Sequence, residues 1–207
     1  MAVRTIRLPI SPQTMVLAVV TIAIGTFSPN MLVSTLRGVG RWQGPLYVIT
    51  DSLSANYKNV ADSSFPKGML PKPQRENNPR MAATNIIVPP AKSSLGAKWY
   101  KTQLFHLVPQ NVSQILYIDT DSQILRPIKI LIRAARNYRK KQVFASKQSC
   151  AFSAPKERWH TFHSNGKYNS GVLLLERDCS RELLAEWSLL IKTGLFHRDQ
   201  LALQAAI

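Results

Sequence analysis

The stretch Gln114 to Leu125, QILYIDTDSQIL, constrains the fold most, because a short apolar run ends abruptly in two carboxylates. Residues 115 to 118 are aliphatic or aromatic, which predicts a strand buried on both faces. Asp119 and Asp121 follow where such a strand leaves its sheet, and in open α/β sheets ligands bind at this edge. Two aspartates at this spacing can converge on one hard divalent cation. An acidic turn would give the same pattern, since Asp and Ser favour turns.

The beginning of the chain predicts two parallel strands joined by a helix. Met15–Ile24 and Leu46–Thr50 are apolar runs, and Met31–Gly40 between them has apolar residues at helical spacing. This order is typical of a βαβ unit with a right-handed crossover. The first run follows two arginines and so also resembles a signal peptide, but its Val, Ile and Thr content favours a buried strand. Asp51 closes the second strand, where it could contact a ribose or a base, or cap a following helix.

The rest of the chain continues this alternation of strands and helices. Ser63–Arg80 holds four prolines and is predicted to be a surface loop. Further strands are expected at Ile86–Val88, Val143–Ala145 and Val172–Leu175, and helices over Ser94–Val108, Arg126–Lys141, Arg181–Lys192 and Asp199–Ile207. With 207 residues, 45% of them hydrophobic, the chain is predicted to form a single α/β domain. Its sheet is expected to be mainly parallel and flanked by helices.

The charge of the chain is strongly basic, with 27 Lys and Arg against 11 Asp and Glu and a net charge of +16. Residues 122 to 156 alone hold nine basic side chains and no acidic one. Lys129, Arg133, Arg136 and Lys140 are spaced to share one helix face. A solvated face is the usual meaning of such a stripe, but an anionic membrane surface or a nucleic acid would also fit it. The sequence shows no recognised nucleic-acid motif, and the carboxylate pair would repel phosphates unless a metal were bound.

The compartment stays open on sequence grounds. Cys150 and Cys179 are too few for a disulfide framework or a zinc cluster, although one disulfide between them is possible. No stretch reaches the length of a transmembrane helix. Asn111 begins a glycosylation sequon, a triplet that often occurs by chance. A secretory-pathway lumen and the cytoplasm are both compatible with these features.

Three short motifs in a fixed order resemble glycosyltransferase family 8, the glycogenin-like and galactosyltransferase-like enzymes with a GT-A fold. They are LYIDTD at 116 to 121, YNSGVLLL at 168 to 175 and DQLALQ at 199 to 204. Each is weak alone, but together with the βαβ start they are fairly specific. The resemblance covers roughly residues 15 to 207. It implies a GT-A-like nucleotide-diphospho-sugar transferase fold and the retaining transfer of a hexose from a nucleotide-diphosphate sugar, usually a UDP-sugar, to an acceptor hydroxyl.

The resemblance also implies roles for particular residues and a metal. Asp119 and Asp121 match the metal-binding pair, with Mn²⁺ as the expected cation, and Asp119 is also placed near the ribose. Lys101 matches a helix lysine that faces the donor phosphates or sugar. The sugar-pocket turn corresponds to Asn169, Ser170 and Gly171. The polar pair beside the reacting carbon corresponds to Asp199 and Gln200. The acceptor would be a sugar, a lipid or a protein.

The chain departs from the family pattern at its end. The family continues past the Asp-Gln helix to a histidine that completes the metal site, whereas this sequence ends at Ile207. A fragment, an earlier histidine or water as the third ligand, and a loss of activity are all compatible with this end. His163 is the nearest substitute, although a surface role fits it better. Two further functions therefore stand beside the transferase: a truncated or inactive donor-binding domain that acts through interaction, and a basic nucleic-acid-binding protein.

Overall fold

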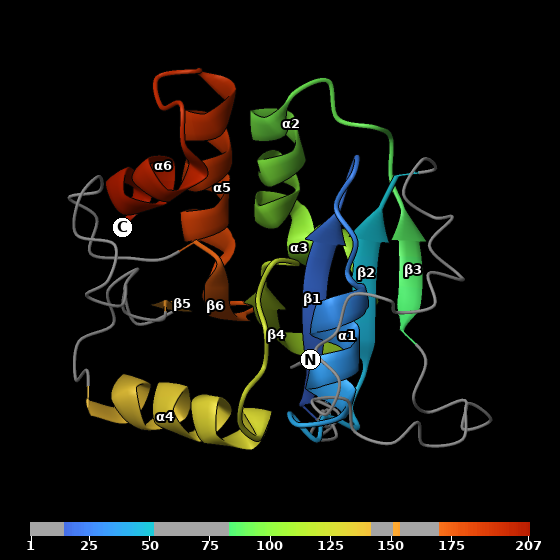
Figure 1. Cartoon of the computed structure of the whole chain (residues 1–207). Coiled ribbons are helices and arrows are strands. Elements are labelled where there is room, and N and C mark those ends of the chain that lie inside the picture. Colours follow the sequence, from blue (N-terminus) through green and yellow to red (C-terminus); the bar gives the residue numbers. More distant parts are fainter. Residues whose placement is uncertain (1–14, 52–82, 142–150, 154–169) are drawn as a thin grey trace, which may run out of the picture.

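The computed structural model describes residues 15–51, 83–141, 151–153 and 170–207, which form an α/β fold around one mixed sheet (Figure 1). The sheet has six strands in the order β3-β2-β1-β4-β6-β5. The strands are β1 (Val16–Ala23), β2 (Leu46–Thr50), β3 (Thr84–Ile87), β4 (Val112–Ile118), β5 (Ala151–Ser153) and β6 (Val172–Glu176). The first four strands are parallel to one another, whereas β6 runs antiparallel to both β4 and β5. The chain therefore builds outward from β1 to β3 and then returns to the other side of β1.

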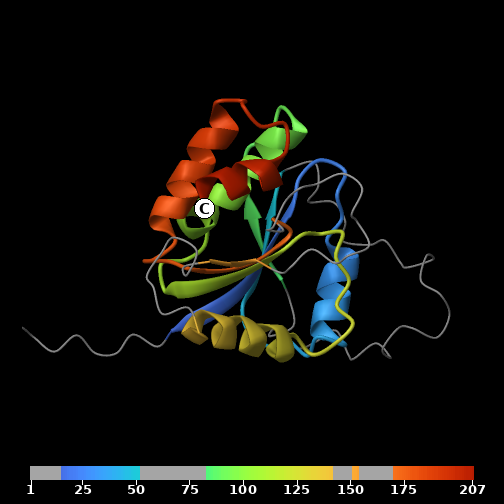
Figure 2. The ribbon, with the colours of Figure 1, turned by 90° about the vertical axis from the view of Figure 1, so that its left-hand side faces the viewer.

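Helices cover both faces of this sheet (Figure 2). One layer contains α1 (Asn30–Arg37) and α4 (Ile128–Lys141), and the other contains α2 (Ser94–Trp99), the 3₁₀ helix η3 (Tyr100–Gln103), α3 (Leu104–Leu107), α5 (Arg181–Lys192) and α6 (Asp199–Ala206). Each layer closes its own apolar core against the sheet. The described part of the chain thus has the three-layer arrangement expected for strands that alternate with helices.

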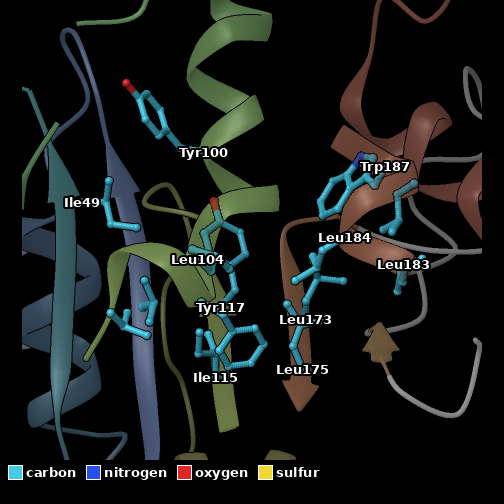
Figure 3. Close-up of a cluster of buried hydrophobic side chains, with 14 of the residues drawn as sticks. Ile49, Tyr100, Leu104, Ile115, Tyr117, Leu173, Leu175, Leu183, Leu184 and Trp187 are labelled. Atoms are coloured by element: carbon cyan, nitrogen blue, oxygen red, sulfur yellow. The ribbon is translucent and has the colours of Figure 1, made fainter. Parts of the chain in front are cut away.

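The two cores follow from the alternation of side chains along each strand. In β4, Ile115 and Tyr117 point into the core beneath α3 and α5, whereas Leu116 and Ile118 point into the core beneath α1 and α4. Trp187 of α5 is fully buried in the first of these cores (Figure 3). An unbroken apolar run is therefore what a strand with two buried faces requires.

Arg177, directly after β6, ties the entry of β4 to the preceding helix. Its guanidinium donates to the backbone oxygens of Phe105 at 2.7 Å, Val112 at 2.8 Å and Pro109 at 2.9 Å. The same group lies 4.9 Å from the centre of the Phe105 ring. The bond to Phe105 satisfies a carbonyl group that the end of α3 leaves without a helical partner. They also fix where β4 begins and hence where its carboxyl end lies.

Most predicted elements are confirmed to within a few residues, and three expectations are corrected or extended. The helix expected over Ser94–Val108 ends at Leu107 and is interrupted by η3. The interruption is of the 3₁₀ type, because the backbone N–H of Tyr100 bonds to the carbonyl of Ala97 three residues back. Strand β4 begins three residues before the predicted run. Strand β5 was not expected. The predictions for Val143–Ala145 and Ser63–Arg80 lie outside the described residues.

Within the described ranges, no helix is both long and apolar enough to cross a membrane. Cys179 is disulfide-bonded, and Cys150, the other cysteine of the sequence, lies outside the described residues.

Candidate active site

A cavity of about 500 Å³ opens at the carboxyl ends of β1 and β4. The strand order reverses between these two strands, and such a switch point is where open α/β sheets bind ligands. The chain after β1, the residues after β4, and helices α2, η3 and α6 all contribute to its wall. The lining residues are Ile22, Ile24, Phe27, Ser94, Ala97, Lys98, Lys101, Tyr117, Asp119, Thr120, Asp121, Ser170, Arg198, Asp199 and Gln200.

Lys101 stands at the centre of the polar part of this cavity. Its ammonium lies 2.8 Å from Oδ2 of Asp199, 3.0 Å from Oδ1 of Asp119 and 3.3 Å from the carbonyl oxygen of Ser170. Lys101 is only 4% exposed. Burial would lower the pKa of Lys101, but the two carboxylates outweigh it and raise that pKa above its ordinary value. The ammonium is therefore charged at neutral pH.

Asp199 is the buried carboxylate that faces Lys101. It is the first residue of α6 and directly follows the N-cap Arg198. Its Oδ2 also accepts a hydrogen bond from Ser170 Oγ at 2.9 Å, while Oδ1 lies 3.3 Å from the ammonium of Lys98. The indole N–H of Trp187 donates to its backbone oxygen at 2.9 Å. Both carboxylate oxygens are thus engaged by cationic or hydroxyl donors.

This arrangement makes stability depend on pH through Asp199. Burial would raise the pKa of Asp199, but Lys101, Lys98 and Ser170 outweigh it and hold that pKa below 3.8. A carboxylate with a lowered folded-state pKa stabilises the fold above its unfolded value and loses that effect as the pH falls through the folded value. We expect the difference in free energy of unfolding between the parent and Asp199→Asn to be constant near neutrality and to shrink below pH 3.8. Urea unfolding at a series of pH values measures it, and a difference that grows on acidification would contradict it.

Asp119 and Asp121 lie at the mouth of the cavity, after the end of β4. The Asp119 carboxylate accepts a hydrogen bond from the Tyr117 hydroxyl in addition to its contact with Lys101, and its side chain is 34% exposed. Its backbone N–H donates to the carbonyl of Gly171 at 2.8 Å, which joins the ends of β4 and β6. Asp121 is exposed. The two aspartates are therefore accessible from the cavity, unlike Asp199.

Asp119 and Asp121 fit a hard divalent cation only when a bound ligand supplies further coordinating oxygens. Among the described residues, no group of three or more His, Cys, Asp and Glu side chains could hold a metal ion. His163, the candidate third ligand, lies outside the described residues. Cations such as Mg²⁺ are commonly held by one or two carboxylates together with phosphate oxygens and water. Asp119 and Asp121 suit a cation bound in this way with a diphosphate.

Gln200 presents an unusual buried amide beside the cavity. Its Nε2 is shielded from solvent and has no hydrogen-bond partner among the described residues. Buried amide groups are nearly always paired, and Gln200 lines the cavity, so a bound ligand could supply the missing partner. Gln200 follows Asp199 on the first turn of α6, as the resemblance implies.

The cavity therefore gathers six of the predicted site residues from four segments: Lys101, Asp119, Asp121, Ser170, Asp199 and Gln200. Gly171 contributes through its carbonyl rather than as a lining residue, and Asn169 lies outside the described residues. Sequence reasoning missed Tyr117 and Lys98. A signal existed for both, because Tyr117 shares a strand face with Asp119 two residues on, and Lys98 shares a helix face with Lys101. Burial and the Asp119 carboxylate raise the pKa of Tyr117 well above its ordinary value, so its hydroxyl remains a donor.

Asp51, at the end of β2, has a structural contact. It is 2% exposed, and its Oδ2 accepts a hydrogen bond from the backbone N–H of Gly25 at 3.1 Å. Gly25 has a φ of 75°, a conformation that glycine adopts readily. Asp51 thereby stabilises the turn through which the chain leaves β1 toward the cavity. Its other expected role, capping a following helix, concerns residues outside the described ranges.

The likeness to known proteins lies in the fold. No protein-family model matches the chain, and no curated protein sequence matches it significantly. The glycosyltransferase GlyE of Streptococcus pneumoniae TIGR4 is similar over 93% of this chain and 43% of its own, with a TM-score of 0.51 and 13% identity, and its apo form gives 0.51 and 12%. Mouse xyloside xylosyltransferase 1 aligns over 86% of this chain and 74% of its own, with a TM-score of 0.47 and 12% identity. The chain spans less than half the length of GlyE. The predicted GT-A-like fold is thus confirmed.

Proposed function

We propose that this chain binds a nucleotide-diphosphate sugar, most simply a UDP-sugar, and transfers its hexose to an acceptor hydroxyl with divalent-cation dependence and retention of configuration. The observation that carries the proposal is the buried Lys101, which bridges Asp119 and Asp199 at the switch point of a GT-A-like sheet. Isolated buried charges are costly, so a buried cation held between two carboxylates inside a ligand cavity favours a functional role. Each of the three motifs that resemble family 8 supplies residues that line this cavity.

The basic side chains suit the departure of a nucleoside diphosphate. Breaking the bond between sugar and diphosphate leaves negative charge on the phosphate, and Lys101, Lys98 and Arg198 all line the cavity. A divalent cation such as Mn²⁺, held by Asp119, Asp121 and the diphosphate, would supply further charge stabilisation there. Lys101 is already fixed by three oxygen acceptors, so little reorganisation is needed when the charge develops.

The polar groups of α6 suit the sugar. The free amide N–H of Gln200 can donate to a sugar hydroxyl, because it has no other partner among the described residues. Asp199 is held by Lys101, Lys98 and Ser170 and thus acts here as a fixed negative charge near the sugar rather than as a free nucleophile. Such a charge favours an oxocarbenium-like centre, which is the charge distribution expected in glycosyl transfer.

A donor-binding domain without turnover is the second candidate. The ion pairs that Asp199 forms with Lys98 and Lys101 favour this candidate. Among the described residues of the cavity, every buried carboxylate has a cationic partner. The 43% coverage of GlyE is also compatible with a domain that acts together with further chain. The two candidates predict the same donor binding and differ in turnover.

Calorimetric titration of UDP with and without Mn²⁺ tests the proposal. We expect binding to require the cation, and Asp121→Asn to weaken it by about 10- to 100-fold, because one of two carboxylate ligands loses its charge. Asp178→Asn is the matched control, since Asp178 is exposed and lies after β6, away from the cavity lining. Equal UDP binding with and without the cation, or equal affinities for the two variants, would contradict the metal-dependent donor site.

Turnover then separates the two candidates. Release of UDP from a panel of UDP-hexoses, with the product anomer assigned by NMR, would support a retaining transferase. Cation-dependent UDP binding with no release from any hexose donor would leave the donor-binding domain as the function.

A further inference from the structure

The outer surface of α4, together with Leu125 and Arg126 shortly before it, combines basic and apolar side chains. We call it the α4 surface, and its members are Leu125, Arg126, Lys129, Ile130, Arg133 and Arg136. All six are exposed, with Leu125 at 74% and Ile130 at 57%. Large aliphatic side chains exposed to this degree beside a row of cations are typical of surfaces that contact something both anionic and apolar.

The packing of α4 fixes which side faces outward. Ile128, Ile132 and Ala135 are buried in the core beneath α1 and α4. Ile130 lies two residues from Ile128 and from Ile132, about 200° around the helix, so it is on the opposite side. Figure 2 shows α4 along one side of the sheet, with α5 and α6 on the other side. The α4 surface therefore has a stable orientation and is separate from the helices that build the cavity.

Among the described residues, no carboxylate forms an ion pair with the α4 surface. In the described part of the chain, none of its four basic side chains forms an ion pair, and α4 has no acidic residue in its first turn. Arg136 donates to the amide oxygen of Gln114 at 2.9 Å, which leaves its charge uncompensated. The positive field of this surface is thus available to a partner.

Neither the rest of this chain nor a second copy of it offers a net charge that complements the α4 surface. Each segment outside the described ranges, 1–14, 52–82, 142–150 and 154–169, holds more basic than acidic residues. A second copy carries the same net charge of +16. Charge complementarity therefore requires a separate polyanion.

We propose that the α4 surface docks the protein on an anionic lipid membrane, with Leu125 and Ile130 entering the headgroup boundary and the basic side chains contacting lipid phosphates and carboxylates. The exposed aliphatic side chains favour a lipid surface over a nucleic acid, because phosphate-backbone contacts are polar and gain nothing from leucine and isoleucine. The cavity lining contains no member of the α4 surface, so a donor can bind while the protein is docked.

Sedimentation with phosphatidylserine-containing vesicles and with neutral phosphatidylcholine vesicles tests the proposal. We expect binding to the anionic vesicles only, weakened by added salt. Replacing Arg126, Lys129 and Arg133 by Gln should weaken vesicle binding by about 100-fold, at roughly fivefold for each basic residue. Replacing Leu125 and Ile130 by Ser should weaken it by about tenfold with the charge unchanged.

The matched control removes the same charge elsewhere: Lys92, Arg181 and Lys192, all exposed and outside α4, are replaced by Gln. Vesicle binding close to that of the parent in this control, together with the two losses above, supports the α4 surface. Equal losses in control and α4 variants would show that only total charge matters and would overturn the proposal. Tighter binding to single- or double-stranded DNA that ignores Leu125 and Ile130 would overturn it in favour of a nucleic acid. Circular dichroism and UDP titration of each variant verify that fold and cavity are unchanged.

Discussion

Replacing Lys101 by Met is expected to lower the free energy of unfolding by about 3–5 kcal/mol, because it leaves the buried Asp199 without its main counter-charge. The methionine matches the length of the lysine stem, so packing is largely kept and the lost ammonium dominates the effect. Asp119 adds less to this cost, since its side chain is partly exposed and water can solvate it. Urea unfolding of parent and variant at neutral pH measures the difference.

A double variant separates the charge effect from packing. Lys101→Met combined with Asp199→Asn removes both members of the pair, and we expect it to be more stable than Lys101→Met alone. A double variant as unstable as the sum of the two single variants would show that the pair does not interact energetically. A loss below about 1 kcal/mol for Lys101→Met would contradict the buried, charged state of this lysine.

Replacing Trp187 by Ala is expected to lower the free energy of unfolding by about 3–5 kcal/mol, since the indole is fully buried between α5 and the sheet. The variant also removes the donor that holds the backbone of Asp199, so the start of α6 should lose its position. UDP affinity should therefore fall together with stability. Trp187→Phe keeps most of the apolar contact and loses the hydrogen bond, with an expected cost nearer 1 kcal/mol from that bond.

The comparison of these two variants shows whether Trp187 positions the site or only fills the core. If Phe restores stability but not UDP affinity, the indole N–H positions α6. If Phe restores both, packing alone is sufficient. A change of less than about 1 kcal/mol in the free energy of unfolding for Trp187→Ala would contradict the full burial of the indole.

The strands and helices could be predicted from the sequence because each is bounded by a local signal. The run Leu46–Thr50 forms a strand with the predicted bounds, and Arg181–Lys192 forms a helix with the predicted bounds. In both, apolar periodicity agrees with the flanking turn residues. The cavity edge was predictable for the same reason, since Asp119 follows directly on an apolar run.

The burial of Lys101 could not be predicted from pattern alone. Lysine is almost never buried without a partner, and its partners Asp119 and Asp199 are distant in sequence. To predict the contact of Tyr117 with Asp119, one must know that the hydroxyl end of this core tyrosine reaches the cavity. The direction of β6 was also hidden, because an apolar run such as VLLLE reads the same in a parallel or an antiparallel strand.

That reversed direction of β6 has a consequence for how such a protein can vary. Between Asp119 and Gly171, which a backbone hydrogen bond joins, the chain forms α4 and the short edge strand β5. This segment, whose described parts include α4 and β5, is thus an excursion with fixed ends. Lengthening a loop costs little conformational entropy once its ends are held together. Related chains could therefore exchange, shorten or extend this excursion, and with it the surface they present to their surroundings, while the two anchoring residues keep their spacing.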